Sequence, residues 1–133
     1  MFLDLEFTMT IKDYKDLTAW QKGMQLAVEV YRLTKLLPEE ETYGLVAQLR
    51  RAVGSIPSNI AEGYGRESTM EYARFLKIAR GSLYEVETQL YLCEALEYLD
   101  HAAVAQALSL SAEIGRMLNT MLRRLNGQMN PSK

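Results

Sequence analysis

The sequence predicts an all-α protein, an up-and-down antiparallel four-helix bundle with a long third helix and a second helix kinked by proline. Apolar residues recur at spacings of three and four through most of the 133 residues, which is the period of an amphipathic helix. Alternating patterns typical of strands are absent, and the segments between helices are short, which favours antiparallel neighbours. We therefore expect one domain over 1–133, with 1–12 and 127–133 as flexible tails.

The first helix is predicted over residues 17–37, where Pro38 ends it. Its N-cap is expected to be Asp16 or Thr18, and Thr18 with Gln21 would form a capping box.

The second helix is predicted over residues 40–62, after glutamates that suit the positive end of a helix dipole. Pro57 lies inside it, lacks a backbone donor and crowds the carbonyl of Val53, so we expect a kink there. The sequence Gly63-Tyr64-Gly65 is expected to stop it.

The third helix is predicted to begin after Ser68, which forms a capping box with Glu71, and to continue to Leu99. At 1.5 Å per residue it would be roughly 45 Å long, longer than its neighbours. The fourth helix is predicted over 101–125, ending before Asn126-Gly127.

A polar stripe follows the apolar face of the second helix. Its members are Gln48, Arg51, Ser55, Asn59 and Glu62. In one interpretation these groups face neighbouring helices or subunits and satisfy one another; in the other they line a groove for a ligand. If Arg51 and Glu62 belong to a buried network, removing one strands the other and costs roughly 3–5 kcal/mol.

The segment 44–63, with Leu17, Trp20 and Gln21 before it and 81–90 after it, resembles the bacterial 23S rRNA intervening-sequence proteins. The resemblance runs from about Asp13 to Leu99. It implies a four-helix bundle that assembles into a barrel-like homopentamer, and it implies no enzyme. The related accessory variability-determinant proteins of diversity-generating retroelements are strongly basic and bind nucleic acid and a reverse transcriptase. The net charge of −2 departs from that second pattern.

The apolar faces of the first and third helices are wider than one small bundle can bury, which predicts a homo-oligomer. Tyrosine suits such an interface because its ring is buried while its hydroxyl stays hydrogen-bonded. The candidate interface residues are Tyr84, Tyr91, Leu92, Leu96, Tyr98 and Leu99.

Charge is unevenly distributed along the chain. Residues 48–80 carry a balance of +3, whereas 81–115 carry six acidic residues and no Lys or Arg. A local basic patch multiplied around a ring could bind a polyanion weakly despite the acidic total. The candidate nucleic-acid contacts are Arg66, Arg74, Lys77 and Arg80.

Catalytic and metal-binding patterns are lacking. His101 is the one histidine, so the Glu-x-x-His pairs of di-metal bundles cannot form, and Cys93 lies in an apolar seam. The sequence predicts no cofactor, no metal, no membrane association and a cytoplasmic location. The true start is left open between Met1 and Met9.

The expected function is a non-catalytic homo-oligomeric scaffold whose partner is RNA or a nucleic-acid-processing protein. The alternative is a small-ligand-binding or enzymatic bundle that uses the polar stripe.

Overall fold

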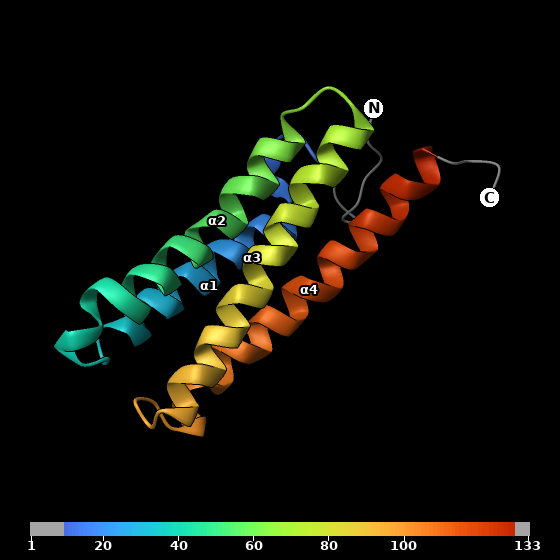
Figure 1. Ribbon diagram of the computed structural model, residues 1–133. Coiled ribbons are helices and arrows are strands. Elements are labelled where there is room, and N and C mark those ends of the chain that lie inside the picture. Colours follow the sequence, from blue (N-terminus) through green and yellow to red (C-terminus); the bar gives the residue numbers. More distant parts are fainter. Residues whose placement is uncertain (1–9, 130–133) are drawn as a thin grey trace.

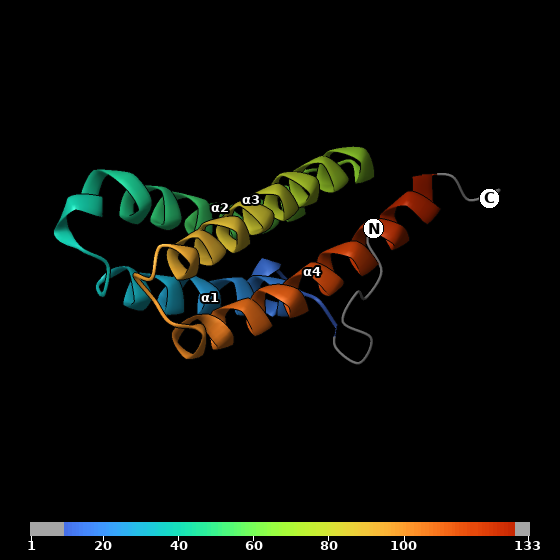
Figure 2. The same cartoon turned by 60° about the horizontal axis from the view of Figure 1, so that its bottom comes forward.

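Four helices form an antiparallel bundle in the computed structural model, which describes residues 10–129. Figure 1 shows successive helices running in opposite directions, and Figure 2 shows α2 and α3 in one layer over α1 and α4. Each helix packs on two neighbours, so α1 and α3 occupy opposite corners. The up-and-down four-helix bundle is confirmed. The helices are α1 Thr18–Thr34, α2 Ala47–Tyr64, α3 Thr69–Ala95 and α4 His101–Met129.

All four helices contribute fully buried apolar side chains to a single core. Burying one such side chain stabilises the fold by about 1.5–3 kcal/mol. Within the described residues, no helix is long and apolar enough to cross a membrane. The core includes Leu26 and Val30 of α1, Leu49 and Ile56 of α2, Leu76 and Leu83 of α3, and Ile114 and Leu118 of α4.

The start of α1 differs from the expected capping box. The N-cap residue is Leu17, which makes no side-chain capping bond, so the predicted box of Thr18 with Gln21 is wrong. A short 3₁₀ helix, η1 Tyr14–Asp16, precedes it and carries its own capping box from Asp13. The Gln21 amide instead donates to the carbonyl of Lys15, which ties η1 to α1.

The chain enters α2 through a 3₁₀ turn, η2 Glu39–Glu41, and a π-helical turn, η3 Thr42–Val46. Helical geometry is interrupted at Gly44, where the Glu41 carboxylate accepts from the amide of Leu45 at 3.1 Å. A Cβ on Gly44 would lie 2.7 Å from that carboxylate, so glycine permits the contact. The break therefore falls at Gly44, while α2 continues as α-helix through Pro57.

Pro57 is buried against α1. A Cβ added to Gly23 would lie 3.5 Å from the proline ring, so the small residue on α1 leaves room for it. As expected, α2 stops near Gly63-Tyr64-Gly65, with Gly65 as its C-cap.

α3 begins after Ser68 as predicted, with the Ser68 half of the expected capping box: the Ser68 hydroxyl accepts from the backbone amide of Glu71 at 3.0 Å, whereas the Glu71 carboxylate pairs with Arg74. It ends at Ala95 rather than Leu99, because Glu97 adopts a left-handed conformation with φ of 63°. The amides of Tyr98 and Leu99 then donate back to the carbonyl of Cys93, the pattern of a Schellman-type cap.

α4 has 29 residues and α3 has 27, so the longest helix is the fourth. α4 passes through Asn126-Gly127 to Met129, and the expected tail over 127–129 is wrong. A helix tolerates one glycine at a cost of about 1 kcal/mol, and no reversal of the chain is required there. Residues 10–12 have no regular secondary structure; the rest of the expected tails, 1–9 and 130–133, lies outside the described residues.

The close approach of α2 to α3 predicts opposite effects for two glycine substitutions. A Cβ at Gly63 would lie 2.7 Å from the Cβ of Phe75, so Gly63→Ala should lower the free energy of unfolding by roughly 1–3 kcal/mol. Nothing lies within 4 Å of a Cβ at Gly81 on α3, so Gly81→Ala should raise it by about 0.5–1 kcal/mol. Urea denaturation measures both; a stabilising Gly63→Ala would contradict the packing.

Candidate functional site

Part of the predicted polar stripe joins α2 to α3. The hydroxyls of Ser55 on α2 and Ser82 on α3 lie 2.8 Å apart. The Asn59 amide donates to both the carbonyl and the hydroxyl of Ser55, each at 2.8 Å. These groups are half-buried and are satisfied by one another, which makes this part of the stripe a structural contact.

A second polar contact lies further along the same two helices. The Gln89 amide, buried on α3, donates to Gln48 on α2 at 3.0 Å and to Glu85 on its own helix at 3.3 Å. The Glu85 carboxylate also pairs with Arg51 at 3.5 Å. Gln48 and Arg51 therefore meet α3 through Gln89 and Glu85, two partners that the sequence analysis did not single out.

The two charged members of the stripe are exposed in this chain, contrary to the buried network proposed for them. The Arg51 side chain is 67% exposed, and Glu62 pairs with exposed Arg66 rather than with Arg51. Charge pairs of this kind contribute at most about 1 kcal/mol, because water already solvates both partners. The stripe thus divides into helix-joining bonds and surface ion pairs.

Four of the six candidate interface residues form an exposed surface at the C-terminal part of α3, here called the apolar end. They are Tyr84, Tyr91, Leu92 and Leu96, each between 44% and 58% exposed.

The other two candidates belong to the chain's own fold. Leu99 is 5% exposed and lies in the core, because the turn after Ala95 directs it inward, so it is not available to an interface in this structure. Tyr98 is half-buried, and its hydroxyl donates to Glu41 at 3.0 Å. That hydrogen bond raises the pKa of Tyr98 above its ordinary value.

The basic candidates lie at the opposite end of α3, and two of them are already engaged. Arg66 pairs with Glu62 at 2.8 Å, and Arg74 pairs with Glu71 at 3.2 Å. Both guanidinium groups lie over the ring of Phe75, at 4.8 Å and 4.6 Å from its centre.

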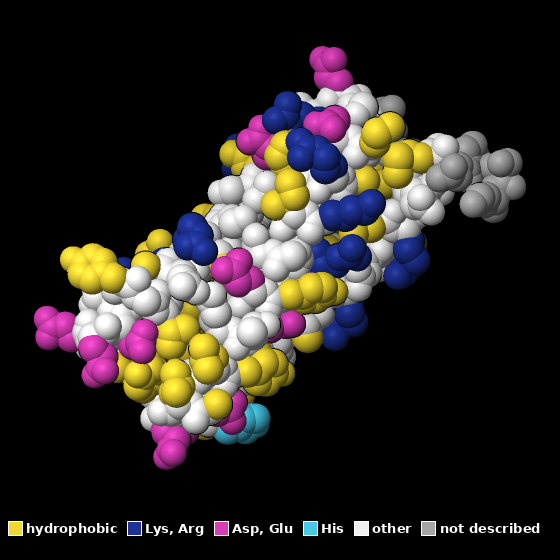
Figure 3. Space-filling view, in the orientation of Figure 1, with side chains coloured by type: hydrophobic (Ala, Val, Ile, Leu, Met, Phe, Trp, Pro, Cys, Tyr) yellow, Lys and Arg dark blue, Asp and Glu magenta, His cyan; other side chains and the backbone are white. Residues whose placement is uncertain are grey.

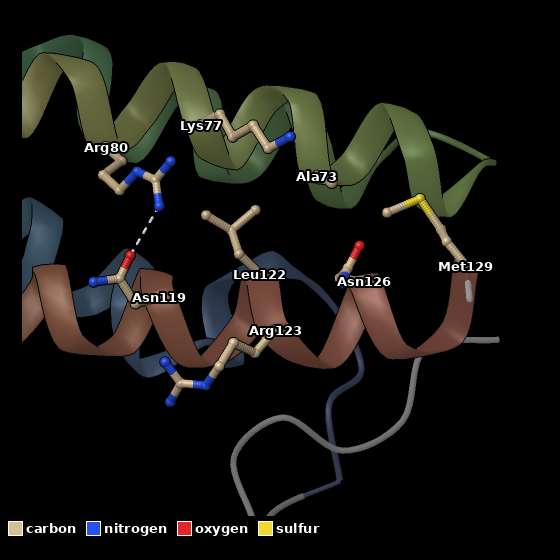
Figure 4. Close-up of a pocket in the computed structure, with 8 residues that line it drawn as sticks. All are labelled: Ala73, Lys77, Arg80, Asn119, Leu122, Arg123, Asn126 and Met129. Atoms are coloured by element: carbon tan, nitrogen blue, oxygen red, sulfur yellow. Dashed lines mark hydrogen bonds between the residues drawn. The ribbon is translucent and has the colours of Figure 1, made fainter. Parts of the chain in front are cut away.

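The other two, Lys77 and Arg80, line a cleft of about 310 Å³ between α3 and α4. Arg80 donates to the side-chain oxygen of Asn119 on α4 at 2.9 Å. Figure 4 shows Leu122 and Asn126 projecting from α4 into the gap, Lys77 lying along α3, and Arg123 extending along the outer side of α4. The full lining is Ala73, Lys77, Arg80, Asn119, Leu122, Arg123, Asn126 and Met129.

The contribution of α4 to this cleft was not predicted. The sequence signal for it was the group of basic residues near the end of the chain, but only the antiparallel pairing brings Arg123 to the same cleft as Lys77. The same pairing places the start of α4 beside the acidic second half of α3 at the other end. Figure 3 shows Lys and Arg side chains along the α3–α4 side of the upper half, with hydrophobic and acidic side chains dominating the lower left.

The single cysteine is part of the packing. Cys93 is fully buried, and burial first, with a smaller effect of Glu41, raises its pKa to about 11. His101 is exposed and lies 3.2 Å from Glu94. Across the described part of the chain, no cluster of His, Cys, Asp or Glu residues could hold a metal ion.

The fold and these surfaces define a class of protein, a small helical bundle whose buried polar groups join helices and whose surface separates a basic end from an apolar end. The chain belongs to the family of 23S rRNA-intervening sequence proteins, which matches residues 15–120.

A solved structure supports the same fold. It is a protein of unknown function from the S23 ribosomal protein family of Bacteroides thetaiotaomicron, 26% identical, with a TM-score of 0.74. The likeness covers 79% of this chain and 98% of that one. No curated protein matches the chain.

The geometry of the stripe predicts unequal effects for two substitutions that both remove a contact to Glu85. Arg51→Ala should change the free energy of unfolding by less than about 1 kcal/mol, because the ion pair is exposed. Gln89→Ala should lower it by about 2 kcal/mol, because it removes a buried side chain and its bonds across the helix contact. Chemical denaturation measures the free energy of unfolding of both variants. A larger decrease for Arg51→Ala than for Gln89→Ala would show that Arg51 belongs to a buried network after all.

Proposed function

We propose that this chain is a non-catalytic, homo-oligomeric helical scaffold that binds RNA through its basic end. The observation that carries the proposal is the separation of two surfaces along the bundle: the cleft between α3 and α4 gathers Lys77, Arg80 and Arg123, and the other end of α3 exposes Tyr84, Tyr91, Leu92 and Leu96. Basic groups attract phosphate, and exposed apolar groups favour self-association.

Self-association is supported by a second apolar surface on α1 and the turn after it, formed by Met24, Val28, Tyr31 and Leu36, of which Val28 is 70% exposed. α1 lies at the corner opposite α3, so the two surfaces are different and face different ways. Contact between unlike surfaces of successive copies is head-to-tail and closes into a ring when the rotation allows. The number five comes from the family resemblance.

RNA is favoured over an acidic protein partner because the basic cleft combines cations with amide groups, the donors that contact phosphates and bases. The acidic second half of α3 confines this contact to one end. We propose no reaction, since the polar stripe is occupied by bonds between helices and Cys93 is buried. A cytoplasmic location agrees with the unpaired cysteine.

Self-association predicts a solution mass above that of the 15.2 kDa chain. Gel filtration with light scattering should give a multiple, five by the family resemblance, and Tyr91→Glu should shift the mass toward the monomer because it places a charge in an apolar contact. Met70→Glu is the matched control, since Met70 is also exposed on α3 but lies at the other end. A monomeric wild-type protein at micromolar concentration would contradict the proposal; a dimer would overturn only the number.

RNA binding predicts a strong dependence on salt. Fluorescence titration should show binding at low ionic strength that weakens to a Kd no tighter than about the micromolar range at physiological salt, because released counterions drive it. An absence of binding at low salt would exclude RNA and leave a protein as the partner of the scaffold.

A further inference from the structure

The cleft between α3 and α4 differs from the rest of the basic end in its unpaired charge. Arg66 and Arg74 each have a carboxylate partner. Among residues 10–129, Lys77, Arg80 and Arg123 form no ion pair, and no acidic side chain lines the cleft. The free positive charge of this end is therefore concentrated where two helices meet.

We infer that this cleft binds an unpaired nucleotide of single-stranded RNA, with its phosphate on Lys77 and Arg80 and its base against Leu122 and Met129. The inference rests on the proposed RNA-binding function and names the site and the form of RNA.

Two cationic side chains, Arg80 and Lys77, lie at the end of the cleft that would bind the phosphate. Arg80 is held across the gap by its bond to Asn119, which uses one of its five donors and leaves the others for an anion. A guanidinium fixed in this way loses little side-chain entropy on binding. Lys77 is exposed and unbound, so its ammonium can move to the same phosphate. Arg123, at the rim, can swing toward an adjacent phosphate along the strand.

The other end of the cleft suits a base. Leu122 rises between the helices, and Met129 extends toward the first turns of α3 (Figure 4). Methionine is flexible and polarisable, so it packs well against aromatic rings. The Asn126 side chain lies between them and lines the same end of the cleft.

The size of the cleft selects single strands. Its volume of about 310 Å³ lies at the small end of the range for ligand pockets, enough for one small group rather than a helix. A duplex keeps its bases stacked inside and cannot place one between α3 and α4, whereas unpaired bases can be splayed out. A positively charged groove with a platform for bases is the usual means of binding single strands.

The test is a fluorescence anisotropy titration of the full chain at low salt with a labelled oligouridylate of roughly ten nucleotides, compared with a duplex of the same length. Lys77→Gln and Arg123→Gln are the cleft variants. Arg74→Gln is the matched control, one turn from Lys77 on the same helix but paired with Glu71. Thermal melting confirms that each variant is folded.

We expect Lys77→Gln to weaken binding about tenfold, because one phosphate contact is lost. The slope of the logarithm of the binding constant against the logarithm of the salt concentration should decrease in magnitude by about one. Arg123→Gln should weaken it less, and Arg74→Gln by less than about threefold, because that charge is already compensated. The duplex should bind more weakly than the single strand.

Three results would overturn the inference in distinguishable ways. Equal losses for Lys77→Gln and Arg74→Gln would show a diffuse basic patch and leave the RNA-binding function intact. Full displacement of the oligonucleotide by micromolar uridine monophosphate would assign the cleft to a free nucleotide. If the wild-type chain bound neither RNA, both the proposed RNA-binding function and the nucleotide site in the cleft would be contradicted.

Discussion

The packing of α2 against α3 is the contact on which the rest of the structure depends. It is the most extensive helix contact in the bundle, and it combines close approach at Gly63 with a hydrogen bond between the Ser55 and Ser82 hydroxyls and one that Gln89 donates to Gln48. The Ser55 and Asn59 groups are paired and favour one register of the two helices, whereas the buried side-chain oxygen of Gln89 has no hydrogen-bond partner among the described residues, which reduces what the Gln48 contact contributes. With that register fixed, α3 presents its remaining flank to α4 and to solvent.

That flank carries both proposed surfaces because α3 and α4 run in opposite directions. The first turns of α3 lie beside the last turns of α4, so basic side chains of two distant segments share one cleft. The acidic half of α3 lies at the other end, together with the apolar residues from Tyr84 to Leu96. One bundle can therefore separate self-association from RNA binding, even though its net charge is −2.

The sequence predicted the helices better than their ends or their contacts. Three-and-four spacing and the Ser68 cap located α3, because such signals act over one or two turns. The turn at Glu97, which sends Leu99 into the core, has no glycine to mark it. The interruption of helical geometry at Gly44 was not predicted, whereas Pro57 lies inside α2 as expected. Partners such as Gln89 for Gln48, or Arg123 for the cleft, follow from helix register, which a single sequence does not specify.

In the proposed function, RNA contacts one end of the bundle only. Ultraviolet crosslinking of the assembled protein to single-stranded RNA, followed by mass spectrometry of the peptides, locates the contact. We expect crosslinks within residues 69–80 of α3 and 116–129 of α4. Crosslinks concentrated in 84–99, around the apolar and acidic end, would contradict it.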